Sequence, residues 1–264
     1  RVILHSPTLS APKMDRLKGF DHSKYGRIQI ELAFEPTLGL KAAVESVCQQ
    51  AVDAVRAGKT LLILSDRHVT EDQWVVSATM ATGAVHHRLI EEGLRCSANI
   101  IVDTAEARDS HHFAVLLGFG ATAVYPYLSY RVINDLVEAD EIVGDPLELH
   151  RNYSKGINKG LLKILSKMGI STIASYRGAQ LFEAVGLSND IVDLCFKGVQ
   201  SRIAGADFSD FENDQKVRHS LAWSTRKPVP QGGFLKYMHD GEYHAYNPDV
   251  IQTLQQAVQT GSYS

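Results

Sequence analysis

The chain contains 264 residues, of which 44% are hydrophobic and 22% are charged, and its formal net charge is −3. This composition is typical of a globular protein with a sizeable core, and it gives no reason to expect nucleic acid or an anionic membrane as a partner. No apolar run approaches the roughly 20 residues that a membrane-spanning helix needs.

Three cysteines, Cys48, Cys96 and Cys195, lie far apart in the sequence. They form no CxxC pair, and their spacing fits neither a zinc site nor an iron–sulfur cluster. We therefore expect thiols that stay reduced, and a cytoplasmic location. The sequence starts with Arg1 inside an apolar run, which predicts a piece of a longer polypeptide.

Strand-like and helix-like segments alternate in the first half of the sequence. Residues 1–6 resemble an edge strand or a tail without its partner, and residues 7–25 are rich in turn formers. Polar and apolar residues alternate over 27–34, which predicts a strand with one buried face. Residues 60–65 are almost entirely apolar, as in a parallel sheet covered on both faces. Further strands are predicted at 97–103 and 121–125, and helices at 40–57, 75–92, 110–117, 129–139 and 147–167.

The stretch from Asn158 to Leu187 repeats this order clearly. Apolar residues at helical spacing end at Gly169, a C-cap position where glycine takes the left-handed conformation at little cost. The β-branched residues of 170–175 predict a strand, and a helix is expected over 177–186. Recurring helix–glycine–strand units predict an α/β fold of parallel (β/α) repeats, either a half-barrel or a TIM-barrel-like fold.

This rhythm fails after Asp190. We therefore expect residues 1–200 to form the parallel α/β body and residues 201–264 to form a mostly helical appendage or linker arm. The appendage is predicted to contain a helix at 208–223, a turn-and-linker segment at 226–233, a hairpin at 234–246 and a last helix that starts at Pro248 with Asn247 as its cap.

Polar side chains follow the predicted strands at their carboxyl ends, where function collects in parallel α/β folds. One interpretation is an acid–base or anion-binding rim. The other is that these residues cap helices and that their charges pair with one another. The candidate residues are Ser65, Asp66, Arg67, Asp103, Thr104, His111, His112, Tyr125, Tyr176 and Arg177.

A second group of polar residues, His86, His87 and Glu91, has a helical spacing that would suit a metal ion. No further ligand stands beside these residues in the sequence, so an exposed helix face is the preferred interpretation.

Several long motifs resemble one known family. They are SDRHV at 65–69, GAVHHRLIEEGLR at 83–95, IIVDTAEARDSHHFAVLLGFGATAVYPYL at 100–128, NKGLLKILSKMGISTIASYRGAQLFEAVGLS at 158–188 and SRIAG at 201–205. Together they resemble the large subunit of bacterial NADPH-dependent glutamate synthase, in the later part of its central domain. The similarity covers nearly the whole chain.

The resemblance implies an enzyme that converts glutamine, 2-oxoglutarate and NADPH into two molecules of glutamate. In that family the large subunit carries FMN and a 3Fe-4S cluster, and the small subunit carries FAD and 4Fe-4S clusters. This sequence lacks the amidotransferase cysteine, the cluster cysteines and the flavin domain. No catalytic, cofactor-binding or metal-binding residue of the family is therefore expected in it, and the chain alone is expected to be inactive.

The implied role is that of a connecting domain. It would hold the amidotransferase and FMN domains of the same polypeptide in register and contribute to an ammonia tunnel, for which the strand-end residues are the candidate wall. Two alternatives stay open. One is a stand-alone (β/α) enzyme that uses the rim at Asp103–His112. The other is an interaction module that docks a partner through the 208–223 helix and the tail.

Overall fold

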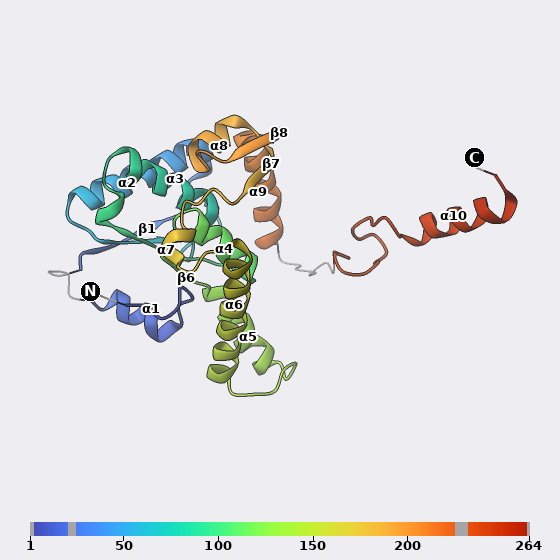
Figure 1. Cartoon of the computed structure of the whole chain (residues 1–264), viewed down its shortest axis with the longest axis horizontal. Coiled ribbons are helices and arrows are strands. Elements are labelled where there is room, and N and C mark those ends of the chain that lie inside the picture. Colours follow the sequence, from blue (N-terminus) through green and yellow to red (C-terminus); the bar gives the residue numbers. More distant parts are fainter. Residues whose placement is uncertain (1–2, 21–24, 225–231, 263–264) are drawn as a thin grey trace. The chain divides into compact units, whose positions relative to one another are not determined.

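The computed structural model describes residues 3–20, 25–224 and 232–262, and Figure 1 shows the elements that they form. The chain divides into two compact units, Arg1–His219 and Ser220–Ser264. The first unit holds the sheets and begins helix α9 (Phe208–Ala222), and the second holds helix α10 (Pro248–Thr260).

A four-stranded parallel sheet forms the centre of the first unit. Its strands are β1 (Arg27–Glu31), β3 (Leu61–Ser65), β5 (Asn99–Asp103) and β6 (Ala123–Tyr125), in the spatial order β1-β3-β5-β6. All neighbours pair in parallel and without a shift of register. The predicted α/β class with parallel repeats is confirmed.

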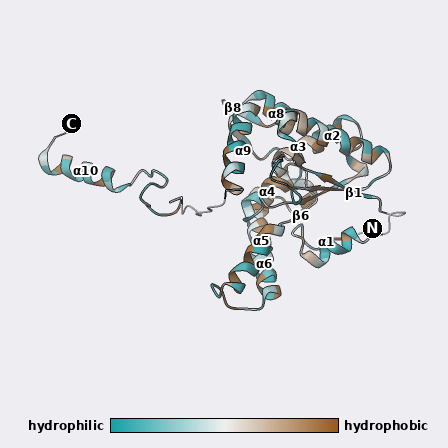
Figure 2. Cartoon of the chain, turned by 180° about the vertical axis from the view of Figure 1, so that it is seen from behind, coloured by the Kyte–Doolittle hydropathy of each residue, from teal (hydrophilic) through white to brown (hydrophobic). Residues whose placement is uncertain are grey.

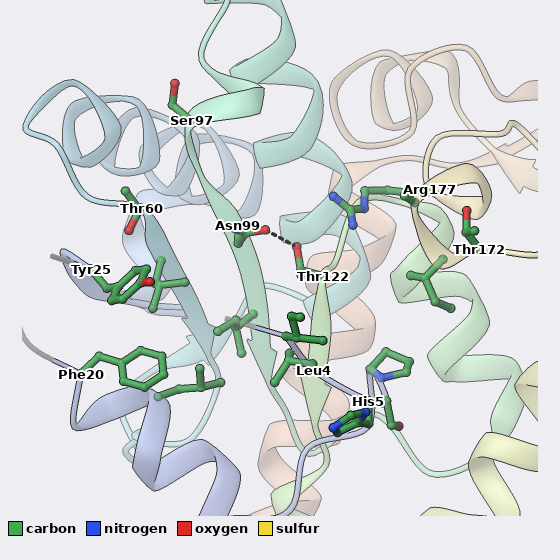
Figure 3. A pocket seen from close by; sticks show the side chains of 18 residues that line it. Leu4, His5, Phe20, Tyr25, Thr60, Ser97, Asn99, Thr122, Thr172 and Arg177 are labelled. Atoms are coloured by element: carbon green, nitrogen blue, oxygen red, sulfur yellow. Dashed lines mark hydrogen bonds between the residues drawn. The ribbon is translucent and has the colours of Figure 1, made fainter. Parts of the chain in front are cut away.

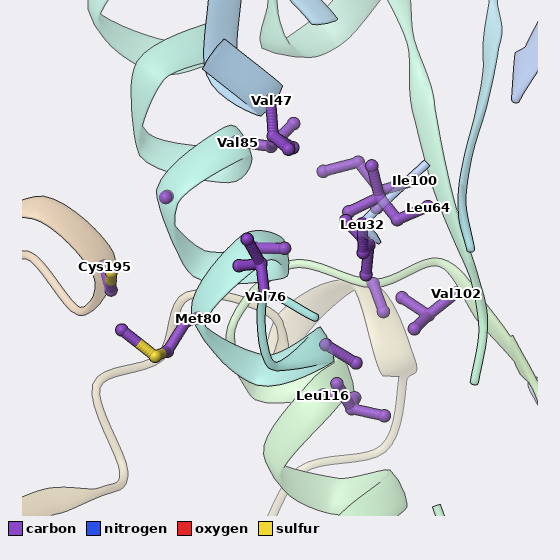
Figure 4. Packing of buried hydrophobic residues seen from close by; sticks show 14 of the residues in the cluster. Leu32, Val47, Leu64, Val76, Met80, Val85, Ile100, Val102, Leu116 and Cys195 are labelled. Atoms are coloured by element: carbon purple, nitrogen blue, oxygen red, sulfur yellow. The ribbon is translucent and has the colours of Figure 1, made fainter. Parts of the chain in front are cut away.

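Three helices cover one face of this sheet: α2 (Leu40–Arg56), α3 (Ala78–Glu91) and α4 (Ser110–Gly118). Side chains alternate along each strand, so Leu64, Ile100 and Val102 point to this side. Figure 4 shows them opposite residues of the covering helices, and Figure 2 shows the strands as strongly hydrophobic. Each fully buried side chain of this size stabilises the fold by roughly 1.5–3 kcal/mol, which makes this layer the main core.

The opposite face is covered by α1 (Ala11–Lys18) and the segment before it. Met14 and Leu17 pack with Ile63, Ile101 and Ala123 in a second, smaller core. The sequence reading of 7–25 as turns around an apolar patch therefore missed a two-turn helix, whose first turn contains a proline, as helices tolerate there.

The predicted edge strand at 1–6 was wrong in position. Residues 3–6 form no strand, and residues 1–2 lie outside the described ranges. Pairing occurs further along, where Thr8 forms a parallel bridge to Val124. The amide of Leu9 donates to the Val124 carbonyl at 2.9 Å, and the amide of Val124 donates to the Pro7 carbonyl at 2.8 Å.

A short antiparallel pair extends the sheet region: β2 (Ala33–Phe34) with β4 (Trp74–Val75). Two short 3-10 turns are η1 (Pro36–Leu38) and η2 (Arg95–Ser97). After β6 the chain forms α5 (Tyr127–Glu138) and the long α6 (Pro146–Met168), which pack against each other. Gly169 closes α6 with a φ of 69°, in the left-handed conformation that the sequence predicted.

The predicted strand at 170–175 and the predicted helix at 177–186 were both wrong. The structure has a one-turn helix, α7 (Ile173–Tyr176), followed by strand β7 (Glu183–Leu187). The hydroxyl of Thr172 accepts a hydrogen bond from the Ser175 amide at 3.2 Å. This local bond offers the backbone a turn in place of a ladder, which β-branched propensity alone does not reveal.

Strand β7 pairs in parallel with β8 (Gln200–Ala206) across the short helix α8 (Asn189–Cys195). Strand β8 was missed because it lies where the regular repeat had failed. Helix α9 follows, as predicted, and its Glu212 accepts a hydrogen bond from the Leu40 amide at 2.6 Å at the start of α2.

In the second unit, α10 begins at Pro248 as predicted. Asn247 stands at the N-cap position, but its side chain accepts a hydrogen bond from the His244 amide and makes no bond to the helix. The predicted hairpin at 234–246 was wrong, because these residues form turns. Of the predicted linker at 226–233, residues 226–231 lie outside the described ranges. No helix in the described part of the chain has the length and apolar character needed to cross a bilayer.

Gly83 is the close contact between α3 and α8. A Cβ atom added at Gly83 would lie 2.0 Å from the Cys195 carbonyl oxygen, which belongs to the backbone and cannot turn away. We expect Gly83→Ala to lower the free energy of unfolding by about 1–3 kcal/mol, as other overpacked contacts do. Urea unfolding of the purified chain measures this loss.

Gly156→Ala in α6 is the matched control. A Cβ at Gly156 meets nothing within 4 Å, so this change should leave stability unchanged or raise it by roughly 0.5–1 kcal/mol. Equal effects of the two substitutions would contradict the packing of α8 on α3.

Candidate functional site

The register of the sheet places one residue of each strand in a single row at its carboxyl edge. Glu31 is opposite Ser65, Ser65 is opposite Asp103, and Asp103 is opposite Tyr125. Because side chains alternate, this row faces the same side as Ile63, Ile101 and Ala123, on which α1 lies. Three of the predicted rim residues thus share one face through backbone pairing alone.

Asp103 is the centre of this row and is fully buried. Arg67 donates to its carboxylate from Nη2 at 3.0 Å and from Nε at 3.3 Å, in the two-point geometry that suits a guanidinium and a carboxylate. The Ser65 hydroxyl donates at 3.3 Å, and Lys18 Nζ from the end of α1 lies at 3.6 Å. Two cations and a hydroxyl therefore balance this buried charge.

Arg67 is also held by aromatic rings. Its guanidinium carbon lies 4.0 Å from the centroid of Tyr127 and 5.5 Å from that of Tyr125. Contacts of this kind contribute about 0.5–1 kcal/mol at exposed sites and more when desolvated. Tyr127 is the last residue of the Tyr125-Pro126-Tyr127 sequence that follows the predicted strand, and it belongs beside the candidates selected from the sequence.

Asp66 and Thr104 form a second buried group at the same edge. The Thr104 hydroxyl donates to Asp66 Oδ2 at 2.5 Å, and the Ala105 amide donates to both carboxylate oxygens, at 3.0 and 3.1 Å. Burial raises the pKa of Asp66, while its hydrogen bonds, including one with Tyr127, act in the opposite direction. The bonds tie the turn after β3 to the turn after β5.

The two histidines of the predicted rim lie at the start of α4. The backbone amides of His111 and His112 donate to Asp109 at 2.9 and 3.1 Å, which caps α4. The ring Nδ1 of His112 accepts a hydrogen bond from the Arg108 amide at 3.2 Å. Among the interactions of the described residues, none joins either imidazole to Asp103.

Tyr176 and Arg177 are not brought to the row. Their selection rested on a strand that does not exist, and they end α7 instead. The amide of Gly178, next to them, donates to the Gly118 carbonyl at 2.8 Å, so this segment lies beside the turn that precedes β6. That turn is at the amino end of the strand, the opposite edge of the sheet from Asp103.

A cavity of ≈870 Å³ lies on the face that α1 covers only in part. Figure 3 shows the N-terminal segment at Leu4 and His5 on one side of it, and Thr60, Asn99 and Thr122 near the amino ends of the strands on the other. Most of its lining side chains are apolar or small and polar. Among the described residues, its basic side chains are Arg177 and His5.

The interpretation of His86 as part of an exposed helix face was wrong. His86 is 7% exposed, and its Nδ1 accepts a hydrogen bond from Arg95 Nε at 2.8 Å. Within the described residues no group of three or more His, Cys, Asp or Glu side chains is arranged to hold a metal ion. On α3, small residues stand at helical spacing from His86. This pattern was the sequence signal that could have indicated its burial.

These features define a parallel α/β domain whose carboxyl edge is closed by ion pairs and short hydrogen bonds. Residues 1–188 match the glutamate synthase central domain family. The chain belongs to this family.

Individual relatives agree with this assignment. The chain is 37% identical to the large chain of the NADPH glutamate synthase of Bacillus subtilis over 266 residues, which covers 100% of this chain and 17% of that one. It is 38% identical over 278 residues to ferredoxin-dependent glutamate synthase 1 of Arabidopsis thaliana, covering 99% and 17%. The chain thus spans about a sixth of the length of these relatives. Among solved structures, a mutant flavocytochrome b2 with benzoylformate is similar at a TM-score of 0.42 and 14% identity, over 65% of this chain and 47% of that one.

Replacing Asp103 tests the ion pairs of the row. Asp103→Asn removes the buried charge and leaves Arg67 and Lys18 facing an amide. Because these two side chains are 33% and 34% exposed, water screens part of the loss, and we expect about 2–4 kcal/mol less stability in urea unfolding. Asp135→Asn breaks only the exposed Arg131–Asp135 pair on α5 and should cost at most about 0.5 kcal/mol. A cost for Asp103→Asn as small as this would contradict the row as described.

The buried imidazole of His86 predicts a pH dependence. Burial, reinforced by Arg95, His87 and Arg177, lowers the pKa of His86 from 6.5 to about 3. Below pH 6.5 the imidazole of His86 is protonated in the unfolded chain but stays neutral in the folded chain. The contribution of His86 to stability is therefore complete above that pH and falls as the pH drops toward 3. Between pH 7 and 5 the native chain should lose about 2 kcal/mol more than His86→Gln. Urea unfolding at both pH values checks this, and parallel losses in the two proteins would contradict it.

Proposed function

We propose that this chain is the connecting domain of a glutamate synthase, which holds the amidotransferase and FMN domains of one polypeptide in register. Residues 1–200 would be the rigid body of this connection, and residues 201–264 would lead toward the FMN domain. Membership of the central domain family supports this role, as does the share of about a sixth that the chain takes of its relatives.

The observation that carries the proposal is the state of the carboxylates at the sheet edge. Asp103 is matched by Arg67 and Lys18, and both oxygens of Asp66 accept hydrogen bonds. A general acid or base must be within reach of a substrate proton. The hydrogen bonds and ion pairs of these carboxylates join one strand end to the next. This favours a scaffold over the alternative of a stand-alone enzyme with a rim at Asp103–His112.

We infer further that the row contributes to the wall of an ammonia tunnel. Ammonia travels as a neutral molecule, and an isolated carboxylate would favour the trapped ammonium ion. Asp103 is compensated by Arg67 and Lys18, the Ser65 hydroxyl donates to it, and the Thr104 hydroxyl donates to the neighbouring Asp66. Such a lining offers hydrogen bonds without a free negative charge.

The whole enzyme would convert glutamine, 2-oxoglutarate and NADPH into two molecules of glutamate. Its FMN and 3Fe-4S cluster would lie in other domains of the polypeptide, and its FAD and 4Fe-4S clusters in a small subunit that binds to it. A cytoplasmic location fits the thiols of Cys48 and Cys195, which are free and buried. We propose no membrane or nucleic-acid partner.

The tunnel assignment predicts which activity is lost when the row is changed. Asp103→Asn in the intact enzyme should lower glutamine-dependent glutamate synthesis severalfold more than ammonia-dependent synthesis. The reason is that ammonia added from solution bypasses the passage between the two sites. Initial rates with each nitrogen donor give the ratio.

Asp135→Asn is the control, since Asp135 is exposed on α5 and should leave the ratio unchanged. A variant that simply folds poorly loses both activities alike. Rates are therefore compared at equal amounts of folded enzyme, and equal loss of both activities would then remove the row from the tunnel wall, while the family assignment would stand.

A further inference from the structure

A second cavity, of ≈420 Å³, lies away from the carboxyl-edge row. It is bordered by α3, by the end of α4 at Gly118 and Phe119, and by the segment from Tyr176 to Phe182. Its volume is in the range of about 300–1,000 Å³ that small-molecule sites occupy. The rings of Phe119 and Phe182 stack with their centroids 5.4 Å apart and form an apolar part of its wall.

The charged side chains around this cavity are mostly cationic. Arg177, which also lines the first cavity, and Lys197 border it together with His86 and His87. Arg95 stands behind His86, and each of its three guanidinium nitrogens donates one hydrogen bond: Nε to His86 Nδ1, Nη1 to the Ala98 carbonyl at 2.7 Å and Nη2 to the Gly120 carbonyl at 2.8 Å. Since Nδ1 of His86 accepts this bond, the hydrogen of the neutral ring is on Nε2. A Cβ atom added at Gly178 would lie 3.6 Å from this Nε2 atom. Nε2 of His86 therefore faces the segment that borders the cavity.

No carboxylate of residues 3–20, 25–224 or 232–262 forms an ion pair with Arg177. Its Nε is buried and has no hydrogen-bond partner among the described residues. Arg95 is near enough that, after burial itself, Arg177 contributes to lowering the pKa of Arg95 to about 10. Glu91 on α3 pairs with Lys197 and Arg88.

Such a group is costly without a ligand. A buried donor without an acceptor loses its hydration and regains nothing, and two half-buried guanidinium groups repel each other. A bound oxyanion would accept a hydrogen bond from the Nε of Arg177. Its negative charge would also offset the repulsion between the two guanidinium groups. Guanidinium groups bind carboxylate and phosphate oxygens in a matching two-point geometry.

We propose that this cavity binds a small oxyanion, a phosphate or carboxylate group, through Arg177, with His86 Nε2 and Lys197 as additional donors. The stacked Phe119 and Phe182 would receive an apolar part of the same ligand. The site is separate from the carboxyl-edge row, and the inference does not depend on the proposed function.

Thermal unfolding of the 264-residue chain tests the site. Inorganic phosphate and acetate are compared with chloride at equal ionic strength. At roughly five times its Kd, a bound anion should raise Tm by about 2–4 °C above the value in chloride. A response to phosphate alone assigns a phosphate group, and a response to acetate alone assigns a carboxylate. No response to either beyond chloride would overturn the proposal.

Variants show whether the response comes from this cavity. Arg177→Gln removes the uncompensated charge, so its Tm in chloride should equal or exceed that of the native chain, while its response to the anion should disappear. Lys197→Gln changes an exposed side chain and should weaken the response severalfold. Arg131→Gln on α5, whose partner is Asp135, should keep the full response. A response that survives Arg177→Gln, or a Tm in chloride that drops on that substitution, would contradict the assignment.

Discussion

The in-register pairing of β1, β3, β5 and β6 is the constraint on which the rest of the structure depends. Because parallel strands pair residue by residue, one pairing decides both which apolar side chains meet α2, α3 and α4 and which polar side chains meet at the carboxyl edge. A slip of one residue on one strand would move all of its side chains to the other face. Asp103 would then leave Arg67 and Lys18, and Ile101 would lose its place under α1.

The sequence predicts the sheet well because apolar runs such as Leu61–Ser65 leave few alternatives to a buried parallel strand. The strand-end rule also found Ser65, Arg67, Asp103 and Tyr125, since it follows from the same topology. It failed at Tyr176 and Arg177. There the Thr172 hydroxyl accepts a hydrogen bond from the Ser175 amide, and the β-branched residues form a helical turn instead of a strand. Lys18 could not be found by this rule, because it comes from α1 and not from a strand end. The hydrogen bond from Arg95 to the buried ring of His86 joins residues nine positions apart, and the helical pattern around His86 does not reveal it.

The two edges of the sheet differ in how they treat charge. At the carboxyl edge, each buried carboxylate has donors fixed around it, and the result is a set of cross-links between consecutive strand ends. Beside the amino edge, Arg95 and Arg177 stand close together, and neither forms an ion pair with a carboxylate in the part of the chain that the structure describes. A scaffold benefits from the first arrangement, because removing one partner would leave a buried charge behind. We propose that a bound anion completes the second arrangement.

The central claim is that this domain connects two reaction centres and turns its carboxyl-edge row toward the space between them. An electron cryomicroscopy map of the intact glutamate synthase that contains this chain tests the claim directly. The account predicts contacts of this domain with both the amidotransferase and the FMN domains, and a continuous passage that reaches Ser65, Asp103 and Tyr125. A map in which this row faces bulk solvent, or in which the domain touches only one of the two, would contradict it.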